Sequence, residues 1–349
     1  MLQSKKPYDR IYVKSRLAIQ DTVILSLRAL EYTVRRDALK KALSTFKVDR
    51  VPSAISIGDL LILMDAYGVK LYTGIIVRME NNFIECQQIM SLFDDNYLYQ
   101  IENKATIEET VAHLIETQFQ KNQDPIIKAI FSPFQIRFQA GKKQILPSVE
   151  EKTIINLEAF LYQLFDDYGI LVECFIPFEK AQPTLEIKTD TRPKIKMIDN
   201  TVYTPIMLPT EEVYEINKLM VYSDETKEFR GTWFGSRNGI TDDPNELTRY
   251  AVVKTNIEFS DDPIENLIAN HLKDDMYNHK LEIEMIINNL YKFEEMSLGQ
   301  RFDIWINNRY YKTILTGYEF VKEANEKIKS VKLIFGKVRT KASQRWNVQ

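Results

Sequence analysis

The chain contains two copies of one hairpin pattern, one near each end of its 349 residues. The first copy, GDLLILMDAYGVKLYTGIIV, begins at Gly58, and the second, GQRFDIWINNRYYKTILTGYEF, begins at Gly299. Each copy has a leading glycine, an apolar run, a polar turn and a second apolar run that contains Thr-Gly, with the glycine at Gly74 or Gly317. Aligned on Thr-Gly, the leading glycine lies 16 residues upstream in the first copy and 18 in the second. The second turn is therefore expected to be two residues longer.

The glycines give this pattern a physical meaning. A leading glycine lets the chain turn sharply into a strand, since it adopts backbone angles closed to other residues. A glycine inside a strand usually marks a bulge or a bend, and small closed sheets need such bends. We therefore predict that each copy is half of a small barrel, with Gly58, Gly74, Gly299 and Gly317 at structural turns and bends. The alternative is two unrelated hairpins that share Thr-Gly.

Between the two copies the period of the apolar residues changes. TIEETVAHLIETQFQK begins with Thr106 and Glu109 at the spacing of a capping box, and its apolar residues recur with a helical period. NLEAFLYQLFDDYG is a second predicted helix, with Gly169 where a C-terminal cap belongs. Two strand-like runs, ILVECFI and TLEIKT, follow. This stretch predicts a small α+β domain.

Prolines at 183, 193, 205 and 209 mark a crossing between domains, and the chain then returns to strand-like runs. Asp262-Pro263 predicts the start of a third helix, with aspartate as the N-cap and proline in the first turn. The predicted fold class is a β-rich α+β protein with two related small β-barrel domains and an α+β domain inserted between them. The predicted boundaries are residues 1–103 for the first barrel, completed by 191–213, residues 104–190 for the insert, and residues 214–349 for the second barrel with one helix and a C-terminal tail.

Composition narrows the classes of function. The net charge of -3 and the pI of about 5.9 argue against stable nucleic-acid binding, which needs a concentrated basic face. No run approaches the roughly 20 apolar residues of a membrane span, and the N-terminus lacks the apolar core of a signal peptide. We therefore expect synthesis in a cytoplasm. Cys86 and Cys174 lie in apolar runs and are interpreted as buried free thiols, with a disulfide as the alternative.

Motifs for catalysis are absent from the sequence. It contains no H-E-x-x-H, no G-x-S-x-G and no G-x-x-x-x-G-K. His113 and His271 fall beside the apolar faces of predicted helices, where a satisfied boundary histidine is the simpler interpretation. Five Asp-Asp pairs could contribute to a calcium site or to a glycosidase pair, but helix caps and solvated turns explain them as well. The aromatic residues of GTWFGS could bind a sugar, although packing is the simpler interpretation. We predict no catalytic residue, no metal and no cofactor.

The order of barrel, α+β insert, proline-rich crossing and second barrel resembles the hub proteins of bacteriophage tails and baseplates. The residues that carry the resemblance are SIGDLLILMDAYGVKLYTGIIV, NLEAFLYQLFDDYGILVECFI, EINKLMVYS and SLGQRFDIWINNRYYKTILTGYEF with the later VKLIFGKVR. The resemblance implies a homotrimer that presents six similar barrels to a hexameric tail tube, with a tip, spike or receptor-binding protein below. It also implies an axial channel through which DNA passes without stable binding, and a place at the tail tip or baseplate of the virion.

Two other functions remain open at this point. One is a tail-associated cell-wall hydrolase, although only 13 residues follow Gly336 in the sequence and we expect no further domain of that kind. The other is a cytosolic barrel protein that binds oligosaccharides or nucleic acid.

The C-terminal tail, GKVRTKASQRWNVQ, is basic and contains no acidic residue. Tryptophan and arginine are frequent anchors of protein interfaces. We therefore predict that Arg345 and Trp346 dock on a partner, either an adjacent subunit or the next tail protein, with the tryptophan in an apolar pocket and the arginine near a carboxylate.

Overall fold

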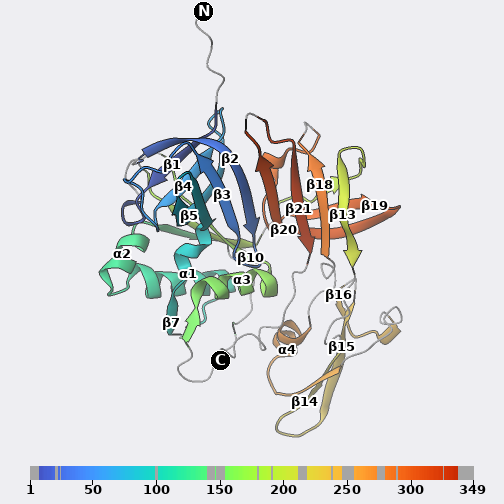
Figure 1. Ribbon diagram of the computed structural model, residues 1–349. Helices are drawn as coiled ribbons and strands as arrows, with labels where there is room; N and C mark the ends of the chain where they lie inside the picture. The colour runs from blue at the N-terminus through green and yellow to red at the C-terminus, as the bar shows by residue number, and fades with distance from the viewer. Residues whose placement is uncertain are drawn as a thin grey trace, which may run out of the picture.

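The fold has a closed barrel and, beside it, a second barrel-like unit that we call the second barrel, with a helical domain below the first and a small sheet domain below the second (Figure 1). This computed structural model describes residues 8–19, 23, 25–98, 101–139, 146, 154–178, 181–189, 192–210, 218–236, 239–245, 255–272, 280–287, 290–324 and 326–336.

The first barrel is built entirely from the N-terminal part of the chain. Its strands pair in the order β1-β4-β5-β6-β3-β2, and pairing of β1 with β2 closes the six-stranded barrel. The strands are β1 (Arg10–Lys14), β2 (Leu25–Asp37), β3 (Leu43–Val48), β4 (Leu60–Met64), β5 (Lys70–Glu80) and β6 (Phe83–Gln88). A 3-10 turn, η1 (Arg16–Ala18), follows β1.

The second unit repeats this strand order with residues from the second half of the chain. Its strands pair in the order β12-β19-β20-β21-β18-β13, so five of them, β19-β20-β21-β18-β13, match β4-β5-β6-β3-β2. The strands are β12 (Ile195–Met197), β13 (Tyr203–Thr210), β18 (Lys280–Ile286), β19 (Arg301–Ile306), β20 (Arg309–Lys322) and β21 (Ser330–Gly336). A 3-10 turn, η6 (Phe293–Glu295), precedes β19.

The sixth strand distinguishes the two units. β1 is antiparallel to β4, whereas β12 is parallel to β19. Among the described residues β12 does not pair with β13, so the second unit is not closed by a strand ladder at this point. Near the seam the Tyr203 hydroxyl donates to the Trp305 carbonyl at 2.6 Å and also lies 3.0 Å from the Met197 carbonyl. One side chain of β13 thus contacts the backbone of β12 and of β19.

This pairing corrects one predicted boundary. The segment 191–213 was expected to complete the first barrel, but its strands β12 and β13 pair with β19 and β18 of the second unit. The first barrel needs no such strand because β1 pairs on both of its edges, with β2 and with β4. The two predicted barrels, each with its own sheet, are also joined in one 12-stranded sheet.

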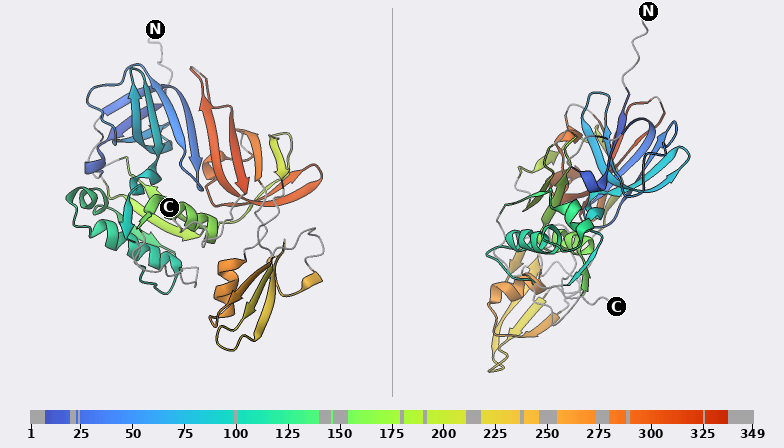
Figure 2. Two further views of the ribbon diagram at one scale, coloured as in Figure 1. Left: turned by 60° about the horizontal axis from the view of Figure 1, so that its bottom comes forward. Right: turned by 90° about the vertical axis from the view of Figure 1, so that its left-hand side faces the viewer.

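The insert domain follows β6 and packs below the first barrel (Figures 1 and 2). It contains a three-stranded sheet, β10-β11-β8, and a two-stranded sheet, β7-β9, with three α-helices. The elements are η2 (Ile89–Phe93), β7 (Asn96–Leu98), α1 (Ile107–Ile115), the π-helical η3 (Glu116–Gln120), α2 (Pro125–Phe131), β8 (Gln135–Phe138), β9 (Ile154–Asn156), α3 (Leu157–Tyr168), β10 (Ile170–Phe175) and β11 (Thr184–Thr189).

The two helix caps predicted in this domain are confirmed. The Thr106 hydroxyl accepts the backbone N–H of Glu109 at 3.2 Å at the start of α1. Gly169 ends α3 with φ 67° and ψ 19°, the left-handed conformation that favours glycine.

A small domain is inserted between β13 and β18, where the first barrel has only the short turn between β2 and β3. Its four-stranded sheet has the order β16-β15-β14-β17, and α4 covers one face through Leu219, Val221, Leu267 and Leu272. The elements are β14 (Lys218–Tyr222), β15 (Phe229–Ser236), β16 (Gly239–Thr241), β17 (Thr255–Phe259) and α4 (Ile264–His271). The sequence interpretation had included these residues in the second barrel, because the strand-like runs carry no sign of which sheet they join.

The start of α4 also differs from its prediction. Pro263, and not Asp262, stands at the N-cap, and no side chain caps the helix. Asp262 lies one residue too early in the chain to serve as the predicted N-cap.

Strand β4 explains the most apolar run of the first copy. Leu61 and Leu63 point into the barrel core, while Leu60 and Ile62 point outward into the core of the insert domain. All four side chains are fully buried. A strand covered on both faces must be apolar at every position, and this is why the run does not alternate.

A polar contact also holds the insert domain to the first barrel. Lys41, in the turn between β2 and β3, lies 3.0 Å from the Glu158 carboxylate at the start of α3 and 2.6 Å from Asp94. The Glu158 side chain is 0% exposed, whereas Lys41 is half exposed. Burial of one partner makes this pair more costly to break than a surface pair.

We therefore expect Lys41→Met to lower the free energy of unfolding by about 2 kcal/mol, because it leaves the buried Glu158 carboxylate without its cation. Urea denaturation of the purified chain measures the change. Lys47→Met is the matched control, since its partner Glu31 is 40% exposed, and it should cost less than about 1 kcal/mol. Equal effects of the two substitutions would contradict this account of the contact.

Candidate functional site: the paired barrels

The leading glycines make the same turn in both units. Gly58 has φ 94° and Gly299 has φ 82°, in the left-handed region that favours glycine. The Gly58 N–H donates to the Ile76 carbonyl at 2.8 Å, and the Gly299 N–H donates to the Leu315 carbonyl at 2.8 Å. In return Ile76 donates to Asp59 and Leu315 donates to Gln300, both at 2.9 Å. The two hairpins therefore begin with one hydrogen-bond pattern.

This pattern makes Ile76 and Leu315 equivalent, and so the alignment on Thr-Gly is wrong. Gly74 and Gly317 are displaced by four residues relative to each other. The equivalent irregularities are the bulges just after Ile76 and Leu315, which interrupt pairing with β6 and with β21. The leading glycine and its hydrogen-bond partner are 18 residues apart in the first copy (Gly58 and Ile76) and 16 apart in the second (Gly299 and Leu315). The second hairpin is thus two residues shorter, not longer, than the first.

Gly74 and Gly317 nevertheless both lie where the backbone is crowded. A Cβ atom on Gly74 would collide with the Gln87 carbonyl and with the Tyr72 side chain. A Cβ atom on Gly317 would lie 2.9 Å from the Arg36 carbonyl of the other barrel. Gly74 therefore permits close packing within the first barrel, and Gly317 permits close approach between the barrels.

The two barrels meet through β2 and β20, which run antiparallel from Tyr32↔Lys322 to Asp37↔Gly317. At one end of this junction Asp9 accepts the Tyr32 hydroxyl at 2.6 Å and forms an ion pair with Lys322. The Asp9 and Lys322 side chains are only 7% and 15% exposed. The outer pair Arg35–Glu319, at 3.0 Å, is more exposed. The junction therefore has a buried ion pair at one end and a solvated one beside it.

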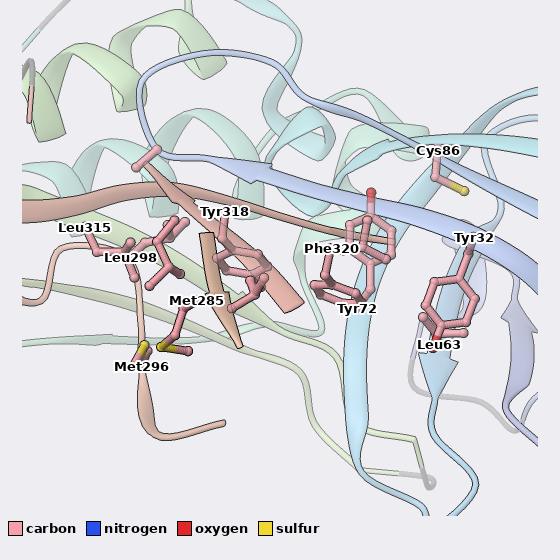
Figure 3. Close-up of a cluster of buried hydrophobic side chains, with 14 of the residues drawn as sticks. Tyr32, Leu63, Tyr72, Cys86, Met285, Met296, Leu298, Leu315, Tyr318 and Phe320 are labelled. Atoms are coloured by element: carbon pink, nitrogen blue, oxygen red, sulfur yellow. The ribbon is translucent and has the colours of Figure 1, made fainter. Parts of the chain in front are cut away.

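The side chains beneath this junction form one core. Figure 3 shows residues of the first barrel, among them Tyr32 and Tyr72, in the same cluster as Tyr318 and Phe320 of the second. The Tyr32 and Phe320 rings meet edge to face with centroids 6.2 Å apart. Because the two barrels share apolar burial as well as a strand ladder, they are expected to behave as one unit.

Arg36 lies where both barrels meet the insert domain. Burial by itself lowers the pKa of this guanidinium, but Tyr318 of the second barrel and Glu173 of the insert domain outweigh it, and the net pKa is raised. Lys70 lies nearby, and its pKa is lowered by burial and by the Arg36 charge. Glu173 also contacts Lys188 at 2.9 Å. Charged groups of the first barrel and of the insert domain thus meet beside the Tyr318 side chain of the second barrel.

The second barrel carries several large apolar side chains on its surface. They lie on β13, at the end of β18, at the start of β20 and in neighbouring loops, and each is at least half exposed: Ile198, Ile206, Ile286, Leu290 and Tyr310. β13 is an edge strand of its sheet, and Pro205 and Pro209 within it cannot donate backbone hydrogen bonds. Prolines on an edge discourage strand addition. This surface is therefore suited to side-chain contacts with a partner rather than to a continued ladder.

The residues considered for chemistry form other contacts. His113 lies 3.3 Å from Glu102, and His271 lies 3.5 Å from Glu258, both near the surface. His279 lies outside the described residues. Among the described residues no three His, Cys, Asp or Glu side chains gather as metal ligands would.

The cysteines are free, with Cys86 buried and Cys174 partly buried. Burial raises the pKa of both thiols, so they stay protonated. Arg345 and Trp346 lie outside the described residues. Within the described ranges no helix has both the length and the apolar character to cross a bilayer.

No family model matches the chain, and no curated protein matches it in sequence. Solved structures match its fold over nearly its whole length. A tail protein from Neisseria meningitidis MC58 is 10% identical, with a TM-score of 0.58 over 94% of this chain and 96% of that chain. The 43 kDa tail protein of prophage MuSo2 from Shewanella oneidensis is 9% identical, with a TM-score of 0.54 over 94% and 97%.

A chain of the phage P2 baseplate, in its activated conformation with Ca, is 13% identical, with a TM-score of 0.50 over 95% of this chain and 100% of that chain. At such low identity these likenesses concern the fold. The chain has the β-rich α+β fold of phage tail and baseplate proteins, and the fold implied by the sequence resemblance is confirmed.

The crowding at Gly74 gives a first test of the barrel. Gly74→Ala should lower the free energy of unfolding by about 2–3 kcal/mol, because the added methyl group has no space beside Gln87 and Tyr72. Gly68→Ala is the control: its turn has open space, so only the backbone strain of φ 86°, about 1 kcal/mol, should appear. Denaturant titration distinguishes the two, and a smaller effect at Gly74 than at Gly68 would refute the crowding argument.

The buried ion pair gives a test of the junction. Asp9→Asn keeps an acceptor for Tyr32 but removes the charge beside Lys322, and it should lower the free energy of unfolding by about 2–3 kcal/mol. Glu319→Gln, at the exposed pair with Arg35, should cost less than about 1 kcal/mol. In the Asp9→Asn variant, amide hydrogen exchange should show a loss of protection at the end of the β2–β20 ladder near Tyr32 and Lys322. Unchanged exchange there in the Asn variant would rule out a role for Asp9 in holding the barrels together.

Proposed function

We propose that this chain is a structural hub protein of a phage tail or baseplate. The observation that carries the proposal is the repeated five-strand order in two units of one sheet, on a fold that phage tail and baseplate proteins share along nearly their whole length. The structural matches support a common architecture, and at a sequence identity near 10% they do not extend to a common partner. The role is therefore derived from the architecture.

Two similar units in one chain are useful where symmetries differ. Three copies of this chain, arranged about a three-fold axis, present six similar units to a partner ring. The same trimer keeps three-fold symmetry at its other end. Closed rings are the usual form of soluble homo-oligomers. We propose a homotrimer that joins a hexameric tail tube to a three-fold tip, spike or receptor-binding protein.

The rigidity of the barrel pair supports this role. A platform that matches a repeating ring must hold its two units at a constant angle, and the β2–β20 ladder, the shared core and the Asp9–Lys322 pair all act against bending there. The exposed apolar side chains on the second barrel supply area for contacts between subunits or with the tube.

An axial channel for DNA completes the proposal. DNA in transit must not bind to the wall, and so a wall without a concentrated positive charge is required. The net charge of -3 supports such a wall. The proposed location is the virion, at the tail tip or baseplate, and the proposed role is structural rather than enzymatic.

The oligomeric state is the decisive measurement. We expect native mass spectrometry at micromolar concentration, or of protein released from particles, to give three times the 41.0 kDa chain mass. A stable monomer or dimer, with no trimer in assembled particles, would overturn the hub assignment. Pure protein that clears peptidoglycan in a zymogram would instead favour the cell-wall hydrolase.

A further inference from the structure

The small domain has one sheet edge that no described strand covers. β17 pairs on one side with β14, in parallel, and its other side has no partner among the described strands. Its sequence, TNIEF, contains no proline, no lysine and a single charge. The opposite edge strand, β16, has only three residues and begins with glycine. An unpaired edge without proline or lysine can accept a further strand, and natural proteins normally blunt or cover such edges.

The face beside this edge is mostly apolar, although one cation lies on it, since the Lys227 Nζ is 5.2 Å from the centroid of the Phe259 ring. On the side of the sheet away from α4, Ile257 is 54% exposed and Phe259 is 51% exposed. Tyr222 on β14 stacks on Phe259 with ring centroids 5.4 Å apart, and Phe229, 56% exposed, meets Tyr222 at 5.5 Å. α4 covers only the other face of the sheet. An apolar face of this kind marks a contact surface.

The small domain is also the most acidic part of the described chain. Its described residues, 218–236, 239–245 and 255–272, contain nine acidic and three basic side chains. Glu258 lies on β17 itself, and Asp261 follows it. A basic partner is therefore favoured at this edge.

The C-terminal tail has the complementary chemistry. Its four charged side chains are all basic, Lys337, Arg339, Lys341 and Arg345, and no acidic residue follows Gly336 in the sequence. In an extended chain these odd-numbered residues share one side, while Val338, Thr340, Ala342, Trp346 and Val348 share the other. The tail is thus an amphipathic strand in sequence, with a basic side and a mostly apolar side.

The tail also begins close to the small domain. Gly336 pairs with Lys280, and Lys280 pairs with Thr210. The chain enters the small domain after Thr210 and returns from it at Lys280. Thr210, Lys280 and Gly336 therefore lie together at the end of the second unit to which the small domain is attached (Figure 2). Thirteen residues span up to about 43 Å when extended, enough to run beside a five-residue strand after crossing a gap.

We infer that the tail, residues 337–349, adds to the edge of β17 in the same chain as a further strand. Thr255 is at the end of β17 nearer the barrel, because it pairs with Lys218, where the chain enters the domain. A tail that leaves the barrel therefore runs parallel to β17. Its apolar side, with Trp346, extends the face of Ile257 and Phe259, and its basic side lies toward Glu258.

Arg345 and Trp346 are thus inferred to dock on β17 of their own chain, and not on an adjacent subunit or the next tail protein. The inference does not depend on the proposed hub function. In the recognition of extended peptides, backbone bonds to a sheet edge supply affinity and alternate side chains supply specificity. The tail and the β17 edge have both features. The small domain would gain a covered edge, as natural sheets require.

Trypsin gives a direct test, since it cleaves after lysine and arginine and the tail has four such residues. In the full chain we expect slow cleavage after Lys341 and Arg345. The double variant Ile257→Asn, Phe259→Ser should raise that rate at least ten-fold. Ile240→Asn, on the opposite edge strand β16, is the matched control and should leave the rate unchanged. Tail cleavage in the parent chain as fast as in the free peptide 337–349, or an unchanged rate in the double variant, would overturn the inference.

Hydrogen exchange provides a second measurement that needs no substitution in the sheet. In a chain that ends at Gly336, amides of β17 should exchange at least ten-fold faster than in the full chain, while amides of β15 should not change. Unchanged exchange in β17 would refute strand addition.

A photoreactive benzoylphenylalanine at position 346 distinguishes docking of the tail within its own chain from docking on a neighbouring chain. In an equal mixture of isotopically heavy and light chains, cross-links to peptides of β17 should join heavy to heavy and light to light only. Cross-links between heavy and light chains, or to a segment outside the small domain, would overturn docking within one chain.

Discussion

Six residues of β2 pair with six of β20, and the arrangement of the two barrels depends on this ladder. Both strands are long, with 13 and 14 residues, because each belongs to its own barrel over one part and to the junction over another. Backbone hydrogen bonds are directional, so a ladder of this length sets the angle between the barrels as well as their distance. The Asp9–Lys322 pair and the shared aromatic core then stabilise an angle that the backbone has already selected.

The same ladder explains why the two units diverge where they do. In the first barrel β1 lies in the gap between β2 and β4 and closes the sheet. In the second unit β12 runs parallel to its neighbour β19, whereas β1 is antiparallel to β4, and the Tyr203 hydroxyl bridges the seam. The five central strands keep their order because they carry the buried core, whereas the sixth strand and the β13–β18 connection have changed. Connections at the surface tolerate such change, and one of them holds a complete small domain.

Two kinds of burial attach the outer domains. The insert domain shares an apolar face with β4, where Leu60 and Ile62 are fully buried, and Lys41 adds a half-exposed ion pair to Glu158. The small domain has its own minor core of four buried residues and leaves one face of its sheet exposed. The insert domain therefore shares a larger apolar core with its barrel than the small domain does. We expect the insert domain to be firmly held and the small domain to be more independent. An independent domain beside the chain end is well placed to make contacts that the barrels do not.

The sequence alone determined the local features: the duplicated hairpin, the left-handed turns at the leading glycines, the caps at Thr106 and Gly169, and the β-rich α+β class. These follow from steric and hydrogen-bond rules that act within a few residues. Only the tertiary structure decided the hairpin register, the membership of segment 191–213, the separate small domain and the fusion of both barrels into one sheet. The Thr-Gly dipeptides suggested a false register, because matching letters do not show which backbone groups pair. Strand pairing joins residues as far apart as Tyr32 and Lys322, and the apolar pattern of a strand shows which side chains are buried but not which strand lies beside it.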